Sequence, residues 1–98
     1  MTIREIYTQL EHSVHPVAKS IHKGDHFNVL VIGFRSGMLL KEHQAKWPSR
    51  LTILEGKVKY VTNKGQIIMD QYDEMVIPLL EIHSVVALTD SLCLLTQG

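Results

Sequence analysis

The chain has very little cysteine and no long apolar run, and both absences limit where it can work. Cys93 is the single cysteine, so no internal disulfide can form. A small domain without disulfides suits a reducing compartment, and we therefore predict a cytoplasmic protein. The longest apolar runs, Val29 to Phe34 and Met75 to Leu80, are far shorter than the roughly 20 residues that cross a bilayer. Arg4 and Glu5 interrupt the apolar run that an N-terminal signal peptide would need.

The chain also lacks an excess of charge of either sign. Its 10 Lys and Arg residues balance 10 Asp and Glu residues. Proteins that bind DNA or RNA normally carry a basic surplus against the phosphates, so no nucleic-acid partner is predicted. With 98 residues, 45% of them hydrophobic, the chain is predicted to form one soluble domain over positions 1–98.

Motifs for several common kinds of catalysis are missing. There is no G-x-G-x-x-G motif for dinucleotides and no G-x-x-x-x-G-K-[ST] motif for nucleoside triphosphates. No serine lies in a G-x-S-x-G motif. Cys93 lies in the apolar segment Leu92 to Leu95, where a thiol is normally inert. Nucleophilic catalysis therefore has no candidate residue.

A short helix is predicted within an N-terminal arm at positions 1–14. Four apolar residues have the spacing of one helical face: Ile3, Ile6, Tyr7 and Leu10. Thr2 and Glu5 form a T-x-x-E capping box at its start. Because a helix of about ten residues is marginal alone, its apolar face is predicted to dock on the rest of the domain or on a second subunit.

From position 24 to position 98 the pattern is that of an all-β protein. Turn residues recur about every 8 to 12 residues, the interval typical of a sandwich or barrel. Between the turns lie segments rich in β-branched and aromatic residues: Phe27 to Phe34, Leu51 to Leu54, Lys57 to Thr62, Gln66 to Met69, Met75 to Ile77, His83 to Leu88 and Leu92 to Leu95. Val29 to Phe34 is apolar on both faces, so it needs a cover on each side. The second cover is either the N-terminal helix or a partner chain, and we predict a homodimer.

Histidine is the chemically versatile side chain that the sequence has in quantity, with six copies. Four lie in the polar N-terminal quarter and are predicted to be solvated: His12, His15, His22 and His26. His43 follows Gly37 by six residues and His83 follows Pro78 by five, each at a strand end in a β-barrel pattern, and they are the candidates for a site.

The segments around His43 and His83 resemble the two cupin motifs. The stretch from Gly37 through His43 to Gly56 is similar in spacing to the first motif, G-x5-H-x-H-x3-E-x6-G. The stretch from Tyr72 through Pro78 and His83 is similar to the second, G-x5-P-x-G-x2-H-x3-N. The resemblance implies an all-β double-stranded helix, the small cupin jelly-roll barrel, with the short helix before it.

Several positions of the motifs carry other residues. Cupins typically hold a divalent metal with three histidines and a glutamate, but this sequence has Ala45 in place of one histidine and Ser49 in place of the glutamate. Tyr72 and Leu80 replace the two glycines of the second motif, and Ala87 replaces its asparagine. The resemblance therefore implies a barrel with a degenerate, incomplete metal site.

One interpretation is a non-enzymatic barrel that binds or senses a small polar or anionic molecule and has no resident cofactor. Its predicted pocket is lined by His43, Ser49, Tyr60 and His83, with Trp47 at the rim and Lys46 and Arg50 nearby. A plainer reading has the two histidines bonded to each other or to water, with no bound molecule.

The alternative is a metal-dependent enzyme of the oxygenase or isomerase type. Glu81 lies two residues before His83 and shares its face if the segment is extended. His43, His83 and Glu81 would then supply the three ligands that a catalytic zinc or non-haem iron site uses. Iron, manganese, nickel and zinc are the metals that this set predicts.

Overall fold

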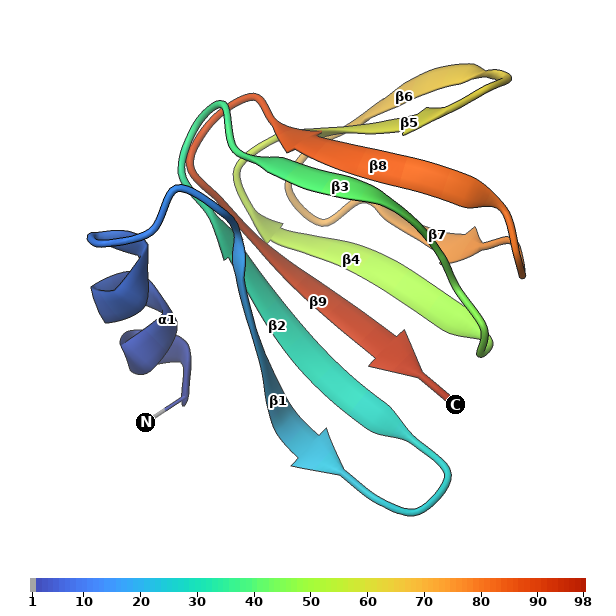
Figure 1. Cartoon of the computed structure of the whole chain (residues 1–98), viewed down its shortest axis with the longest axis horizontal. Helices are drawn as coiled ribbons and strands as arrows, with labels where there is room; N and C mark the ends of the chain where they lie inside the picture. Colours follow the sequence, from blue (N-terminus) through green and yellow to red (C-terminus); the bar gives the residue numbers. More distant parts are fainter. Residues whose placement is uncertain (1) are drawn as a thin grey trace.

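One helix and nine strands make up residues 2–98, the part of the chain that our computed structural model describes (Figure 1). The elements are α1 (Thr2–Leu10), β1 (Val17–Lys23), β2 (Asn28–Phe34), β3 (Leu39–Gln44), β4 (Ser49–Glu55), β5 (Val58–Thr62), β6 (Gly65–Met69), β7 (Glu74–Ile77), β8 (Ile82–Ala87) and β9 (Ser91–Gln97). The strands form two antiparallel sheets that face each other, with the orders β1-β2-β9-β4-β7 and β3-β8-β5-β6. No helix in this described part is long and apolar enough to cross a membrane.

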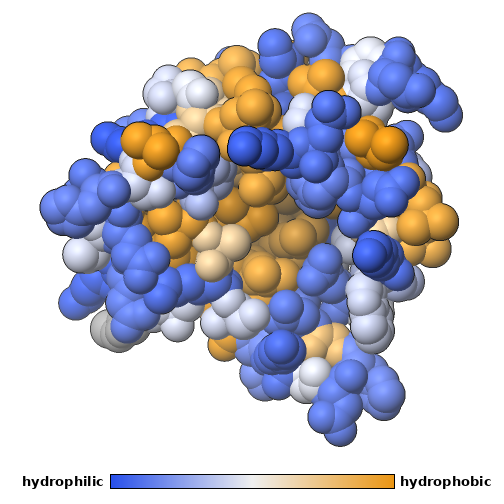
Figure 2. All heavy atoms as spheres, viewed as in Figure 1, coloured by the Kyte–Doolittle hydropathy of each residue, from blue (hydrophilic) through white to orange (hydrophobic). Residues whose placement is uncertain are grey.

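The core lies between the two sheets. Along β4, Ser49, Leu51 and Ile53 are buried and alternate with residues that keep some exposure, which is the period of a strand with one face in the core. Val58 and Tyr60 of β5 are buried in the same way from the other sheet. Figure 2 shows apolar side chains gathered in a hollow at the centre of the face viewed, with hydrophilic side chains around it. The predicted all-β barrel is therefore confirmed.

Two strands were missing from the sequence prediction. β1 and β3 consist mostly of exposed residues, and their sequences VAKSIHK and LLKEHQ carry no clear alternation. They are the edge strands of the two sheets on one side of the barrel, where only part of each strand is covered. The periodicity of buried residues therefore could not reveal them.

The predicted helix is confirmed, and it covers the outer face of β2. Ile6 and Leu10 are its buried residues. A methyl group added at Gly33 would collide with Ile6 and lie 2.9 Å from Leu10 Cδ1, so a glycine is what lets the helix approach the strand. Val31 lies two residues earlier on the same face of β2 and is fully buried. The second cover of this strand is thus the helix, and the homodimer stays a prediction.

Two non-glycine residues have a left-handed backbone. Tyr72 has φ 71° and Leu80 has φ 62°. Both stand where the second cupin motif has glycine, so the barrel keeps the backbone conformation although the glycines are gone. A side chain in this region costs about 1–2 kcal/mol. The side chains are 74% and 60% exposed, so their packing offsets little of that cost.

Leu80→Gly is expected to raise the free energy of unfolding by up to about 1 kcal/mol. The substitution removes the left-handed strain, while the added freedom of glycine in the unfolded chain takes back about 0.4–1 kcal/mol. Leu79→Gly is the matched control, because Leu79 is 56% exposed but has no positive φ. Urea unfolding measures both variants. Equal losses of stability in the two variants would show that Leu80 is not strained.

Candidate functional site

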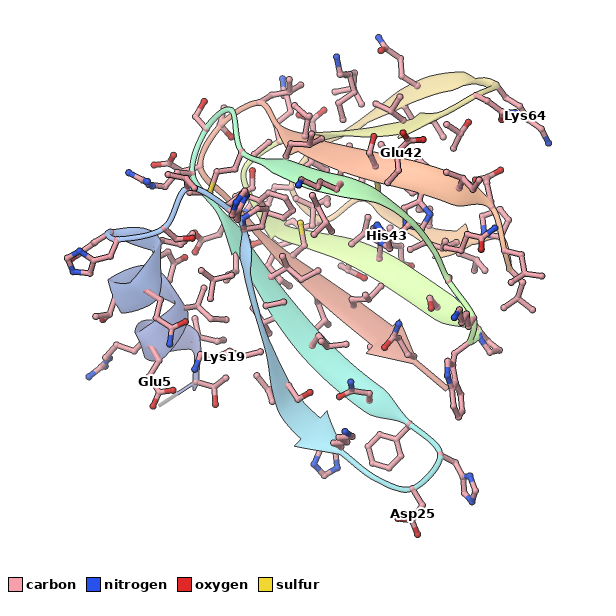
Figure 3. The ribbon with its side chains drawn as sticks, viewed as in Figure 1. Glu5, Lys19, Asp25, Glu42, His43 and Lys64 are labelled. Atoms are coloured by element: carbon pink, nitrogen blue, oxygen red, sulfur yellow. The ribbon has the colours of Figure 1, made fainter. Side chains whose placement is uncertain are left out.

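A bulge in β3 turns His43 toward the space between the sheets. Leu40 pairs with Val85 across β3 and β8. The next pair is His43 with His83, so β3 has two residues between these pairs where β8 has one. In a regular strand, His43 and Leu40 would point to opposite faces. The extra residue returns His43 to the inner face, and Figure 3 shows it pointing between the sheets while Glu42 points outward.

The imidazoles of His43 and His83 contact each other at this pair. Their ring centroids are 4.1 Å apart, and the ring planes meet at 61°. Each Nδ1 lies within hydrogen-bond distance of the carbonyl oxygen two residues earlier, at 2.7 Å from Lys41 and 3.0 Å from Glu81. A carbonyl can only accept, so Nδ1 carries the proton in each ring. In the neutral form both rings therefore present a bare Nε2 lone pair.

The two histidines differ in their exposure to solvent. His43 is exposed, whereas His83 is 2% exposed. Burial lowers the pKa of His83, and the nearby His43 lowers it further, against the opposing effects of the Glu81 carbonyl and carboxylate. Because its pKa lies below the ordinary value of about 6.5, His83 is neutral at pH 7.

Tyr60 connects the histidine pair to Glu81. Its ring stacks on His83, with centroids 5.0 Å apart and planes at 21°. Its hydroxyl donates a hydrogen bond of 3.1 Å to Glu81 Oε1. Burial raises the pKa of Tyr60, and the bond to the Glu81 carboxylate and its charge raise it further, so the hydroxyl remains a donor at pH 7. We name these four residues the histidine–tyrosine cluster: His43, His83, Tyr60 and Glu81.

A cavity of about 320 Å³ opens against the outer end of this cluster, and we name it the Tyr60 cavity. It is lined from β5, β6, β7 and the segment after β7 by residues that include Tyr60, Thr62, Gln66, Ile67, Met75 and Glu81. Lys64 also lines it, at the tip of the β5–β6 hairpin, where Figure 3 shows its side chain pointing away from the barrel. The volume is in the range of small-molecule sites, about 300–1,000 Å³.

The structure brings together only part of the predicted pocket. His43, His83 and Tyr60 belong to one cluster. Ser49 is buried on β4, where its hydroxyl donates to the Trp47 carbonyl at 2.8 Å, and it lines a separate surface hollow. Trp47 is 51% exposed and lines a third hollow, at the end of the barrel. Tyr60, Ser49 and Trp47 therefore line three different hollows and do not form one pocket.

The predicted three-ligand metal set is not assembled. Glu81 gives its backbone carbonyl to His83 and a carboxylate oxygen to Tyr60. Within residues 2–98, no three His, Cys, Asp or Glu side chains are grouped so that they could hold a metal ion. Two imidazoles fall short of the three protein ligands of catalytic zinc or the two histidines and one carboxylate of non-haem iron sites. The residues present therefore do not fit a resident catalytic metal.

Sequence reasoning missed the polar and apolar walls of the Tyr60 cavity. Thr62, Gln66 and Met75 carry no motif. Gln66 and Met75 come from β6 and β7, which are edge strands of the two sheets, and Thr62 comes from β5 beside β6. The signal that was present is the pairing of Tyr60 with Glu81, two residues that the sequence analysis considered for different sites. Their hydrogen bond depends on how β5 and β8 lie side by side, which local sequence does not encode.

No protein-family model matches the sequence, and none of the curated proteins is significantly similar to it. Solved structures are nevertheless similar in fold. A cupin superfamily protein from Desulfitobacterium hafniense has a TM-score of 0.79 at 16% identity, over 85% of this chain and 76% of that chain. An RmlC-like cupin from Desulfovibrio desulfuricans has a TM-score of 0.76 at 25% identity, over 84% and 80%. A cupin-2 domain protein from Shewanella frigidimarina has a TM-score of 0.77 at 11% identity, over 100% and 93%. These likenesses confirm the predicted jelly roll and show that the chain has the fold of the cupin superfamily.

Proposed function

We propose that the protein is a non-enzymatic barrel that binds or senses a small polar molecule in the Tyr60 cavity. The observation that carries this proposal is the continuous contact from Glu81 through Tyr60 and His83 to His43, with its outer end in a cavity of suitable volume. Small-molecule sites typically combine a mostly apolar wall with a few polar groups that converge on one side. Tyr60 and Glu81 are the polar groups at the end of the cavity that meets the cluster, and Thr62, Lys64 and Gln66 also line it.

The polar end of the cavity suits a ligand that donates hydrogen bonds. Glu81 Oε1 accepts from Tyr60, and Glu81 Oε2 has no hydrogen-bond partner in the described part of the chain. An ionised carboxylate accepts only, so its free oxygen binds a hydroxyl or an ammonium group and repels an anion. Ile67, the cross-strand partner of Tyr60, and Met75 of β7 add apolar surface to the cavity. We therefore favour a small alcohol or amine over the anionic ligand that the sequence left open.

The histidines act in this proposal as positioning residues. His83 is buried and neutral, and its ring holds Tyr60 by stacking. Burying a neutral imidazole at this position costs less desolvation free energy than burying an imidazolium would. Protonation of His83 is thus expected to disturb both the cluster and the barrel.

A fragment panel tests the proposal on the purified full chain. Small primary amines and alcohols are expected to shift the backbone NMR signals of Thr62, Gln66 and Glu81, while carboxylates of the same size do not. Glu81→Gln is expected to weaken the best fragment about tenfold or more, because a hydrogen bond to a charged group contributes about 1.5–3 kcal/mol.

Glu42→Gln is the matched control, since Glu42 is exposed and points outward from β3. It is expected to leave fragment binding unchanged. Preferential binding of the carboxylates, or an equal effect of both substitutions, would overturn the proposal.

The metal-dependent enzyme keeps one observation in its favour. Metal-binding histidines almost always donate their second ring nitrogen to a carbonyl or carboxylate, and His43 and His83 both direct Nδ1 at carbonyls. Elemental analysis of untagged protein separates the two functions. Stoichiometric iron, manganese, nickel or zinc that is lost in His43→Ala would support the enzyme, and metal-free protein that gains no thermal stability from these ions would support the binding barrel.

Folding stability is expected to fall as the pH drops below about 6.5. The unfolded chain protonates His83 near that ordinary pKa, whereas the folded protein does so only at lower pH. Between the two values the unfolded state binds more protons, so stability rises with pH there. His83→Gln should flatten this dependence in urea unfolding between about pH 5 and pH 8. His12→Gln, at an exposed position, should keep it, and an unchanged slope in His83→Gln would contradict the assignment.

A further inference from the structure

The hollow that Trp47 lines has a volume of about 250 Å³ and shares no lining residue with the Tyr60 cavity. Three separate segments build it: the β1–β2 turn, the turn between β3 and β4, and the end of β9. Figure 3 shows Asp25 at the tip of the first of these segments. The residues that matter for its chemistry are Lys23, Asp25, Phe27, Asn28, Trp47 and Gln97.

Backbone contacts hold the walls of this hollow in place. The Gly24 amide donates to the Phe27 carbonyl at 3.0 Å, which closes the β1–β2 turn. The Gly98 amide donates to the Pro48 carbonyl at 2.9 Å, which ties the end of β9 to the turn that carries Trp47. The Phe27 ring packs on Gly24, where a methyl group would collide with it, and its centroid lies 5.1 Å from that of the His22 ring. The hollow is therefore formed before any ligand arrives.

Two aromatic rings face solvent at this hollow. Trp47 is 51% exposed and Phe27 is 42% exposed. Large aromatic side chains dominate binding energetics because they bury much apolar area with little loss of conformational entropy. The flat face of an indole is a surface on which the C–H groups of a saturated ring can pack.

Neutral amides supply the polar contacts. Asn28 and Gln97 are paired residues on the adjacent strands β2 and β9, so their side chains leave the sheet together. The Ser20 hydroxyl donates to Asn28 Oδ1 at 2.7 Å, which leaves the amide nitrogen of Asn28 as a donor. The Gln97 amide has no hydrogen-bond partner among residues 2–98. Amides both donate and accept, as the hydroxyls of a ligand do.

The charges at the hollow cancel. Lys23 and Asp25 both line it and have opposite signs, so the hollow selects neither an anion nor a cation. A neutral ring that carries several hydroxyls satisfies all of these features: its C–H face packs on Trp47, and its hydroxyls meet Asn28 and Gln97. We infer that this hollow is a binding site for a sugar-like, neutral polyhydroxylated ring, independent of the ligand of the Tyr60 cavity.

Tryptophan fluorescence tests this site directly, because Trp47 is the single tryptophan of the chain. Titration of the full chain with methyl β-D-glucopyranoside, methyl β-D-galactopyranoside and myo-inositol is expected to give a saturable blue shift for at least one probe, with a Kd of about 1 mM or tighter. Gln97→Ala is expected to weaken that probe about fivefold to tenfold. Asn28→Ala is expected to weaken binding of the same probe by a similar factor. It serves as the test if Gln97→Ala does not fold.

Two controls assign the signal to this hollow. Gln9→Ala removes an exposed glutamine of α1 and should leave the titration unchanged. Tyr60→Phe should also leave it unchanged, which separates this site from the Tyr60 cavity. No saturable change with any of the three probes, or the same affinity in Gln97→Ala or Asn28→Ala as in the unaltered chain, would overturn the inference.

Discussion

The extra residue in β3 determines which side chains meet inside this barrel. Without the bulge, His43 would point to the outer face, and Glu42 would take its place beside His83. With it, the centroids of the two imidazoles lie 4.1 Å apart on neighbouring strands, and each Nδ1–H donates a hydrogen bond to the carbonyl two residues earlier in the chain. The stacking of Tyr60 and its hydrogen bond to Glu81 continue from this pair. A local irregularity of the backbone thus creates the cluster on which the proposed function depends.

The barrel keeps features of the cupin pattern whose side chains have changed. Tyr72 and Leu80 have a left-handed backbone at positions where the motif has glycine. Glu81 accepts a hydrogen bond from Tyr60, and the Tyr60 cavity opens beside it. A shared fold therefore does not by itself assign the chemistry of this barrel, which depends on the side chains of the cluster.

The spacing of apolar residues in the sequence predicted most of the fold. The docked helix was predictable because Ile6 and Leu10 have the spacing of one helical face. The apolar strands were predictable because segments such as Val29 to Phe34 are rich in β-branched residues and lie between turns. The exposed edge strands β1 and β3 lack such a pattern. The site was predictable only in part, because spacing brings His43 and His83 together, whereas the partners of Glu81 and Ser49 follow from sheet register and loop path. The sequence alone did not show that Trp47 lies apart from the histidines. That placement depends on the path of the turn between β3 and β4, which puts Trp47 at another hollow.

The most direct test of the histidine pair is to determine which ring nitrogen of His43 and of His83 carries the proton. Long-range ¹H–¹⁵N correlation spectra of the labelled protein at about pH 8, where free histidine is neutral, distinguish the two neutral tautomers. We expect His43 and His83 both to carry the proton on Nδ1 and to show contacts between their ring protons. A proton on Nε2 of either ring, or two rings without mutual contacts, would contradict the cluster and the function proposed from it.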